Sequence, residues 1–130
     1  MPFVTDTHAL IWHLTGDPRL SAEARRVFRD ADQGRETVYI PCILLFELSY
    51  LFEKKRVAVD IGNVISMLRT SGNYRVEPMC VPVIQRSLSL SRVAVPDPWD
   101  RLIAGTAIHL GLPLITRDQA LQDSGIKTFW

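Results

Sequence analysis

Apolar and polar residues alternate along this chain in short blocks, and turn-forming residues separate one block from the next. Short apolar runs such as FVT at residues 3–5 and LIT at 114–116 are typical of buried strands. Between the runs lie longer stretches with the apolar spacing of an amphipathic helix, such as SAEARRVFRDA at 21–31. Strands that alternate with helices, without hairpin signals, predict an α/β fold with a mostly parallel sheet covered on both faces.

Turn-forming and capping residues, namely Gly, Pro, Ser and Asp, indicate where each helix and strand begins and ends. Strands are predicted at residues 3–5, 37–40, 74–79, 114–116 and 127–130. Helices are predicted at about 7–14, 21–31, 42–56, 61–70, 83–91 and 99–110, with a short further helix that starts at Asp118. Ser21 and Asp60 suit helix N-caps, and Gly16 and Gly111 stand where helices are expected to end.

The size of the chain fits one compact domain. With 130 residues, 47% of them hydrophobic, it can bury a core without disulfides, and we expect residues 1–130 to form a single domain. Fifteen basic residues nearly balance 14 acidic ones, so the net charge of +1 predicts no broad field for nucleic acid or membranes. Twelve of the basic residues are arginine, whose planar fork favours a phosphate-bearing partner.

The cysteines and the N-terminal segment predict where the protein resides. Cys42 and Cys80 form no CxxC pair, and we expect reduced core thiols in a cytoplasmic protein. The run MPFVTDTHALIWHL carries no basic leader and contains Asp6, and no 18 consecutive apolar residues occur. We therefore expect a soluble protein without a membrane segment.

Glu47 lies within ILLFELSYLF, residues 43–52, among eight apolar side chains. The nearly continuous apolar surface predicts a helix that is buried on most sides, with no Arg or Lys three or four residues from Glu47. An ionised carboxylate removed from water is strongly unfavourable unless something pairs with it. The partner must be a distant arginine, such as Arg101 or Arg117, or a cation shared with other acids.

Four aspartates stand at strand ends or helix starts. Asp6 and Asp118 follow predicted strands, and parallel strands would bring both to the carboxyl edge of the sheet, where ligands bind in such folds. In PDPWD, Asp97 suits an N-cap and Asp100 the third helical position, where a carboxylate complements the helix dipole. Taken singly, each aspartate is explained by capping alone.

A shared divalent cation would explain the acids together with Glu47. Carboxylates gathered in one cleft repel each other and stay protonated unless a cation neutralises them. Oxygen ligands favour Mg²⁺ or Mn²⁺, whereas zinc prefers His and Cys. The three histidines show no HxxxH or HExxH spacing, and His8 is expected to be a packed or surface side chain. The chain also lacks GxSxG and GxxxxGK[ST], which argues against most common hydrolases and NTPases.

Four segments follow one another in an order and spacing found in a known family. They are VTDTHALIW at 4–12, FEL at 46–48, PDPWDRLIAGTAIHLGLPLITRD at 96–118 and the terminal TFW. Together they resemble the PIN-domain nucleases and, more narrowly, the VapC-type toxins of bacterial and archaeal toxin–antitoxin pairs. The resemblance covers nearly the whole chain and implies a three-layer α/β/α fold, with a parallel sheet of four or five strands between helices.

The resemblance places the acidic positions of the family on Asp6, Glu47, Asp100 and Asp118. It implies metal-dependent endonucleolytic cleavage of RNA with Mg²⁺, for which Mn²⁺ can substitute. Asp6 and Asp100 are predicted to hold the principal ion, and Glu47 and Asp118 to complete its shell directly or through water. Asp97 belongs to the DPxDR form of the third motif, and we interpret it as a helix cap.

Two positions depart from the pattern of many relatives. Val95 stands where they have His, and Leu44 where they have Ser. Because the four acids are intact, we expect the metal chemistry to survive. We expect these two changes to affect side chains that orient a carboxylate or contact RNA in the relatives, so the rate and the specificity should differ more than the type of reaction.

The resemblance also implies partners. It predicts an RNA substrate, a small antitoxin whose tail fills the acidic cleft, and a homodimer as the toxin's own state. Arg101 and Arg117 each adjoin a site acid, and each is a candidate either to bind phosphate or to serve as a counter-ion for the carboxylates. The basic run at 54–56 is interpreted as a solvated helix end.

Two other classes of function remain open from the sequence. In a non-catalytic protein-interaction or RNA-binding module, the aspartates would only cap helices and Glu47 would pair with an arginine; such a module predicts no stabilisation by metal. Phosphotransfer on a rim aspartate is ranked below it, because Thr7 and His8 follow Asp6 where a DxDxT pattern would be needed.

Overall fold

The centre of the molecule is a five-stranded parallel sheet. The computed structural model describes residues 1–130, and its strands are β1 (Phe3–Thr5), β2 (Val38–Pro41), β3 (Tyr74–Glu77), β4 (Leu114–Ile115) and β5 (Thr128–Phe129). The strand order is β3-β2-β1-β4-β5, and each neighbouring pair is parallel. The predicted parallel sheet is confirmed.

Seven helices connect and flank the strands: α1 (Thr7–Thr15), α2 (Ala22–Asp32), α3 (Cys42–Glu53), α4 (Ile61–Thr70), α5 (Val81–Leu88), α6 (Pro98–Leu110) and α7 (Gln119–Asp123). The side chains of Ser21, Asp60 and Asp97 accept backbone N–H groups at the starts of α2, α4 and α6, as predicted. Gly16 and Gly111 adopt the left-handed conformation that ends α1 and α6. None of these helices has both the length and the apolar character needed to cross a bilayer.

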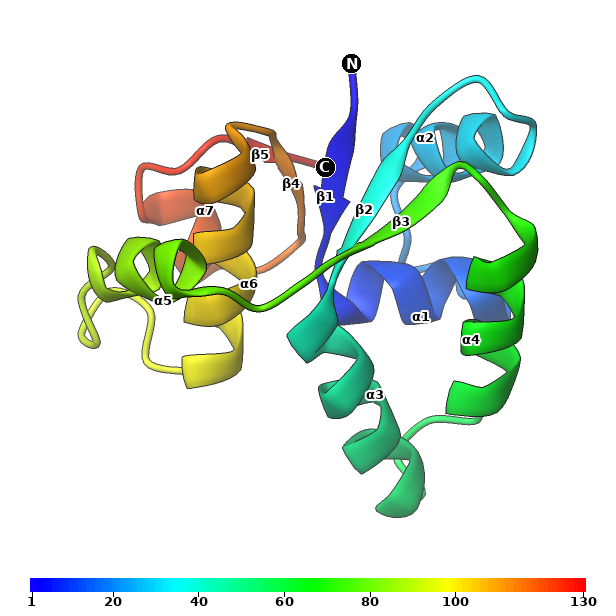
Figure 1. The fold of residues 1–130 in the computed structure, drawn as a ribbon, viewed down its shortest axis with the longest axis horizontal. Coiled ribbons are helices and arrows are strands. Elements are labelled where there is room, and N and C mark those ends of the chain that lie inside the picture. Colours follow the sequence, from blue (N-terminus) through cyan, green and yellow to red (C-terminus); the bar gives the residue numbers. More distant parts are fainter.

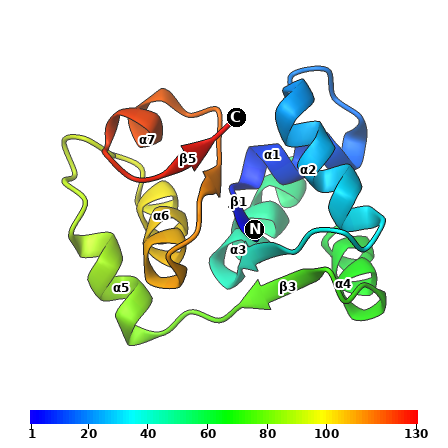
Figure 2. The same ribbon diagram turned by 90° about the horizontal axis from the view of Figure 1, so that it is seen from above.

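Helices cover both faces of the sheet. Figures 1 and 2 show α1, α2 and α4 on one side and α5, α6 and α7 on the other, with α3 extending from the carboxyl end of β2. Successive residues of β1 face opposite sides, because Phe3 belongs to the larger buried cluster with α1 and α2, and Val4 to the smaller one with α6. This arrangement is the expected three-layer α/β/α fold.

The order of the strands reverses beside β1. The chain moves outward from β1 to β2 and β3, and later returns to place β4 on the other side of β1. The connections after β1 and β4 therefore leave on opposite faces of the sheet, and a crevice forms between the carboxyl ends of these two strands. Asp6 follows β1 directly, and Asp118 lies shortly after β4, so both stand at this crevice.

Helix α3 is more exposed than its apolar sequence predicts. Leu44 and Leu48 are buried, whereas Phe46, Tyr50 and Phe52 are exposed. The helix runs past the carboxyl edge of the sheet, where no second layer covers its outer side (Figure 1). The prediction that it is buried on most sides is therefore wrong.

Two local predictions at the ends of α3 are also wrong. Cys42, its first residue, is exposed and free rather than a core thiol; Cys80 is also free. The helix ends at Glu53 instead of residue 56 because Lys55 takes the left-handed conformation, with φ of 56°. The N–H of Arg56 then bonds to the carbonyl of Leu51 at 3.0 Å, which is the closing bond of a Schellman motif.

Helices α5 and α6 approach each other closely at a glycine. A methyl group on Gly105 would lie 2.7 Å from the carbonyl oxygen of Val83 and 2.8 Å from the backbone nitrogen of Ser87. Both are backbone atoms of α5, which cannot avoid the methyl group by a change of side-chain rotamer. Gly105 therefore sets the spacing of α5 against α6, the helix whose first turn carries Asp100.

Replacing Gly105 by Ala should lower the free energy of unfolding by about 2 kcal/mol, because overpacking a close interface costs about 1–3 kcal/mol. Urea unfolding followed by circular dichroism measures the change. Gly62→Ala is the matched control: a methyl group there meets only the Asp60 carboxylate at 3.2 Å, on an exposed helix. It should be neutral or stabilising by up to about 1 kcal/mol. Equal destabilisation by both changes would contradict the packing argument.

Candidate active site

Asp6 occupies the junction between β1 and α1. Its side chain accepts a 2.8 Å hydrogen bond from the N–H of Ala9 and caps α1. The residue is nevertheless 8% exposed, which is unusual for a capping aspartate. Burial raises the pKa of its carboxyl group to about 6, and the Asp118 charge adds to this rise, while the hydroxyl of Thr116 opposes it. Asp6 therefore both caps a helix and faces an acidic site.

Glu47 lies in the middle of α3 and is held by a hydroxyl group. Thr7 Oγ1 donates a 2.6 Å hydrogen bond to Glu47 Oε1. None of the ion pairs of the chain involves Glu47, so the alternative of a pair with Arg101 or Arg117 is excluded. Burial raises the pKa of Glu47, and the nearby Asp97 raises it further, against the effect of Thr7.

Asp100 is the third residue of α6, as predicted, but its side chain makes no capping bond. The N-cap Asp97 accepts the N–H of Trp99 at 2.8 Å, and no donor contacts the Asp100 carboxylate. Burial raises the pKa of Asp100 to about 7. Four neighbouring carboxylates add to this shift: Asp97, Asp118, Asp6 and Glu47. A carboxyl group without a donor and surrounded by acids keeps its proton close to neutral pH.

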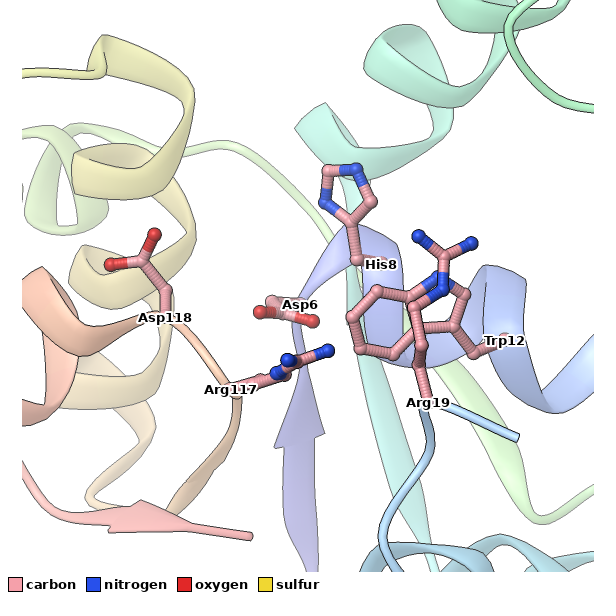
Figure 3. Close-up of a pocket in the computed structure, with 6 residues that line it drawn as sticks. All are labelled: Asp6, His8, Trp12, Arg19, Arg117 and Asp118. Carbon is pink, nitrogen blue, oxygen red and sulfur yellow. The ribbon is translucent and has the colours of Figure 1, made fainter. Parts of the chain in front are cut away.

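Asp118 is the fourth predicted acid at the crevice, and it lies in the segment that follows β4. Its Oδ1 accepts the N–H of Leu121 at 3.0 Å and caps α7, and its own N–H donates to Thr116 Oγ1 at 3.0 Å. Figure 3 shows Asp118 on one side of Asp6 and His8 and Trp12 of α1 on the other, with the guanidinium of Arg117 below Asp6 and directed toward Trp12. The four predicted acids thus come from four separate segments that the fold brings to one edge of the sheet.

No arginine or lysine neutralises this acidic cluster. All five ion pairs of the chain involve acids elsewhere. Arg117 lines the same cavity as Asp6 and Asp118 without pairing with either. Arg101 lines no cavity, and its buried Nε has no hydrogen-bond partner. The acids at the crevice therefore have no arginine or lysine partner, and the one basic side chain that lowers the pKa of Asp6 and Glu47 is His8.

The carboxylate oxygens of these acids are ligands that hard divalent cations prefer. The side chains, however, do not lie close enough together to form a complete coordination shell. No three His, Cys, Asp or Glu side chains lie close enough to hold one ion as they stand. Burial is the main cause of the raised pKa values of Asp6 and Asp100, and neighbouring carboxylates add to both. Mutual repulsion keeps such groups apart, and a divalent ion draws them together. Carboxylate oxygens without cysteine favour Mg²⁺ or Mn²⁺ over zinc.

Two adjoining cavities open onto the acids. The first, of about 380 Å³, is lined by Asp6, His8, Trp12, Arg19, Arg117 and Asp118 (Figure 3). The second, of about 480 Å³, runs along α1 and α3 and reaches Glu47 and Asp97. Asp100 lines neither cavity, consistent with its partial burial behind them.

The sequence analysis missed the two threonines that hold the carboxylates. Thr7 donates to Glu47, and Thr116 supports both Asp6 and the backbone of Asp118. The only feature of the sequence that could have indicated these threonines is their position, because each lies one or two residues from a predicted site acid. His8, expected to be packed or on the surface, is exposed and borders both cavities.

The two positions that depart from the pattern of the resembling family lie in the hydrophobic cores. Leu44 and Val95 are both fully buried, each in a different cluster. Their side chains serve packing on the two faces of the sheet. Neither delivers a polar group to the acids; Thr7 orients Glu47, and backbone N–H groups orient Asp6 and Asp118.

Comparisons with known sequences agree with the resemblance. The family model described as PIN domain matches residues 3–126. Ribonuclease VapC22 of Mycobacterium tuberculosis is 29% identical over 117 residues, which cover 90% of this chain and 87% of that protein.

Solved structures share the fold along nearly the whole chain. VapBC2 from Rickettsia felis, bound to a DNA fragment from its promoter, matches with a TM-score of 0.72 and 16% identity over 99% of this chain and 98% of that one. VapC20 of Mycobacterium tuberculosis, described as a sarcin-ricin loop cleaving toxin, matches with a TM-score of 0.66 and 16% identity over 95% of both chains. At this level of identity, these structures establish the fold alone.

The acidic cluster predicts how the stability of the metal-free protein depends on pH. Burial raises the pKa values of Asp100 and Asp6 in the folded state to about 7 and about 6, from the ordinary value of 3.8. Between these values the folded state binds more protons than the unfolded state, so this contribution to stability falls as pH rises from about 4 to about 7. Asp100→Asn removes much of it and should raise the melting temperature in EDTA by a few degrees at about pH 8, with a clearly smaller rise at about pH 5, where only part of the difference has developed.

The control for this measurement is Glu77→Gln. Glu77 lies on β3 and forms no ion pair or side-chain hydrogen bond, so its effect on the melting temperature should be small and similar at both pH values. A lower melting temperature for Asp100→Asn at about pH 8 would contradict the inferred repulsion.

Proposed function

Because this chain belongs to the PIN-domain family, we propose that it is a metal-dependent endoribonuclease and the toxin of a toxin–antitoxin pair. Metal dependence is a general property of PIN-domain nucleases. We propose Mg²⁺ as the ion, with Mn²⁺ able to substitute. The similarity to Ribonuclease VapC22 supports RNA as the substrate, and the description of VapC20 as a toxin supports the biological role.

One observation of the structure carries the proposal. Acids from four segments meet at the point where the strand order reverses, and no basic side chain pairs with them. Capping accounts for Asp6, Asp97 and Asp118, but it leaves Asp100 and Glu47 unexplained. A partner that is cationic, small and attracted to oxygen ligands explains all of them at once.

The proposed roles of the four acids are those that the resemblance to the family implies. Asp6 and Asp100 hold the ion, and Glu47 and Asp118 complete its surroundings directly or through water. When bound, a divalent ion activates a water and neutralises the charge that develops on the phosphoryl oxygens. Thr7 keeps the Glu47 carboxylate in a fixed orientation. Hydrolysis by such a water would leave 5′-phosphate and 3′-hydroxyl ends on the RNA.

The surroundings of the acids also suit an anionic substrate. Helices α1 and α6 both begin at the site, and the positive ends of helix dipoles stabilise phosphate groups. Arg117 is proposed to bind the RNA backbone because its guanidinium lines the cavity without an acidic partner. Arg101 remains a weaker candidate for the same role, since it lines no cavity.

The proposal extends to the partners and location of the protein. Residues 1–130 would act as a single catalytic domain in the cytoplasm. A cognate antitoxin would cover the acidic cleft with its tail, and the toxin would form a homodimer. Exposed apolar side chains on α3 and α5, such as Phe46, Val81 and Leu88, supply surface for contacts between proteins.

The alternative is a non-catalytic protein-interaction or RNA-binding module. It is favoured by the capping bonds of Asp6, Asp97 and Asp118, which give each of these residues a structural role. It requires an arginine partner for Glu47, and none contacts that residue. The two functions make opposite predictions for the response to metal.

Divalent metal should stabilise the wild-type protein. A ligand that binds only the folded state at roughly 100 times its Kd adds about 2.7 kcal/mol, which raises the melting temperature of a chain of this size by several degrees. Asp100→Asn should abolish the shift, and Glu77→Gln should keep it. Melting curves in Mg²⁺, Mn²⁺ and EDTA test this, and superimposable wild-type curves would favour the interaction module.

Asp6→Asn and Asp100→Asn should each lower the rate of RNA cleavage by more than about 100-fold, which exceeds the usual cost of losing a residue that only supports a metal ligand. Cleavage of a single-stranded oligoribonucleotide in Mg²⁺, with sequencing of the product ends, gives both the rate and the end chemistry. Far-ultraviolet circular dichroism confirms that each variant is folded. Wild-type rates in either folded variant would refute the proposed site.

A further inference from the structure

Arg19 is held in a rigid position beside the acidic site. Its Nε and Nη2 donate to the two carboxylate oxygens of Asp17 at 3.1 and 2.8 Å, and its backbone N–H donates to the same carboxylate at 2.8 Å. The loop that carries both residues follows the end of α1 directly. Two of the five N–H groups of the guanidinium are used in this fork, and three remain for another acceptor.

Trp12 supplies the surface on which Arg19 rests. The guanidinium carbon of Arg19 lies 4.8 Å from the centre of the indole ring, and that of Arg117 lies 5.7 Å from it. Trp12 itself is 8% exposed and packs edge-on against Trp130, with ring centres 5.9 Å apart. One fixed indole therefore positions two guanidinium groups that come from opposite ends of the chain (Figure 3).

Arg19 also stands where the two cavities of the site meet. His8, Trp12 and Arg19 line both of them. The first cavity contains Arg117, and the second contains Arg56. Arg19 is the only arginine that lines both cavities, and each cavity contains one further arginine, so a chain of phosphates that passes from one to the other has Arg19 within the stretch that they share.

We propose that Arg19 binds a backbone phosphate of the RNA next to the phosphodiester bond that is cut, with Trp12 and Asp17 as the residues that position its guanidinium. This inference rests on the proposed endoribonuclease function and specifies how the protein binds its RNA substrate. A planar guanidinium that is oriented in advance loses little freedom when it forms a two-pronged bond to phosphate. Because Arg19 belongs to the binding track and not to the acids, its loss should act mainly on affinity and KM.

A simpler role for Arg19 is to close the turn after α1 through its ion pair. Arg35 offers the matched control, because it also pairs with an aspartate, Asp30, at 2.8 Å, its side chain is similarly exposed, and it lines neither cavity. If only the ion pair matters, Arg19→Ala and Arg35→Ala will behave alike in RNA binding. If Arg19 contacts phosphate, the two variants will differ.

The experiment measures binding of a fluorescently labelled, single-stranded oligoribonucleotide to proteins that also carry Asp100→Asn, so that cleavage does not interfere. Arg19→Ala should weaken binding about tenfold and reduce the slope of log affinity against log salt concentration by about 0.7, as expected for one lost phosphate contact on a single strand. Arg19→Lys should restore the salt slope but only part of the affinity. Arg35→Ala should match the parent.

A second measurement identifies the phosphate. Oligoribonucleotides in which one linkage at a time carries a neutral methylphosphonate should each bind less well to the parent protein. At one linkage beside the cut position, the loss should be much smaller in Arg19→Ala, because the contact is already absent. A purely structural role of Arg19 produces no such position.

The outcomes separate this inference from the proposed function. Parental affinity and salt slope in Arg19→Ala would overturn the phosphate contact, while metal-dependent cleavage by the protein without Asp100→Asn would still stand. A shared loss in Arg19→Ala and Arg35→Ala would likewise overturn it in favour of a structural role. Selective loss in Arg19→Ala, with no metal-dependent cleavage, would support the contact and refute the nuclease.

Discussion

Repulsion among like charges at the carboxyl edge of the sheet is the constraint on which the rest of this structure depends. Burial raises the pKa of Asp100 to about 7, and four neighbouring carboxylates add to this rise. Like charges at such distances destabilise a folded protein unless protons or a cation compensate them. No arginine or lysine forms an ion pair there. The site is therefore incomplete as a purely protein structure, and its chemistry points to a divalent ion held by oxygen ligands.

The fold makes this arrangement tolerable through backbone groups. Asp6, Asp97 and Asp118 each accept an N–H group at the start of a helix, so the same carboxylates that repel one another also satisfy backbone donors that would otherwise lack partners. Capping and function are thus not competing explanations for these aspartates. Capping does not explain Glu47 and Asp100, because neither carboxylate accepts a hydrogen bond from the backbone.

The positive groups of the site are arranged around the acids and do not pair with them. Arg19 and Arg117 both lie against Trp12, and Arg19 is already committed to Asp17. If these arginines paired with the acids instead, the carboxylates would be neutralised and a metal ion would bind poorly. Under the proposed function, separate positions would let one region attract the ion while its border attracts the phosphates of the RNA.

Local chemistry in the sequence determined the order and type of the elements, the caps at Ser21, Asp60 and Asp97, and the four acids, since each of these depends on residues only a few positions apart or on recognisable motifs. Contacts between distant segments were decided only by the tertiary structure. The bond from Thr7 to Glu47 spans 40 positions, and the Trp12 surface receives arginines from both ends of the chain. Even the exposure of α3 depends on where the sheet ends rather than on its own apolar pattern. Periodicity specifies which face of an element is apolar, but strand order and the crossing of segments decide what that face meets.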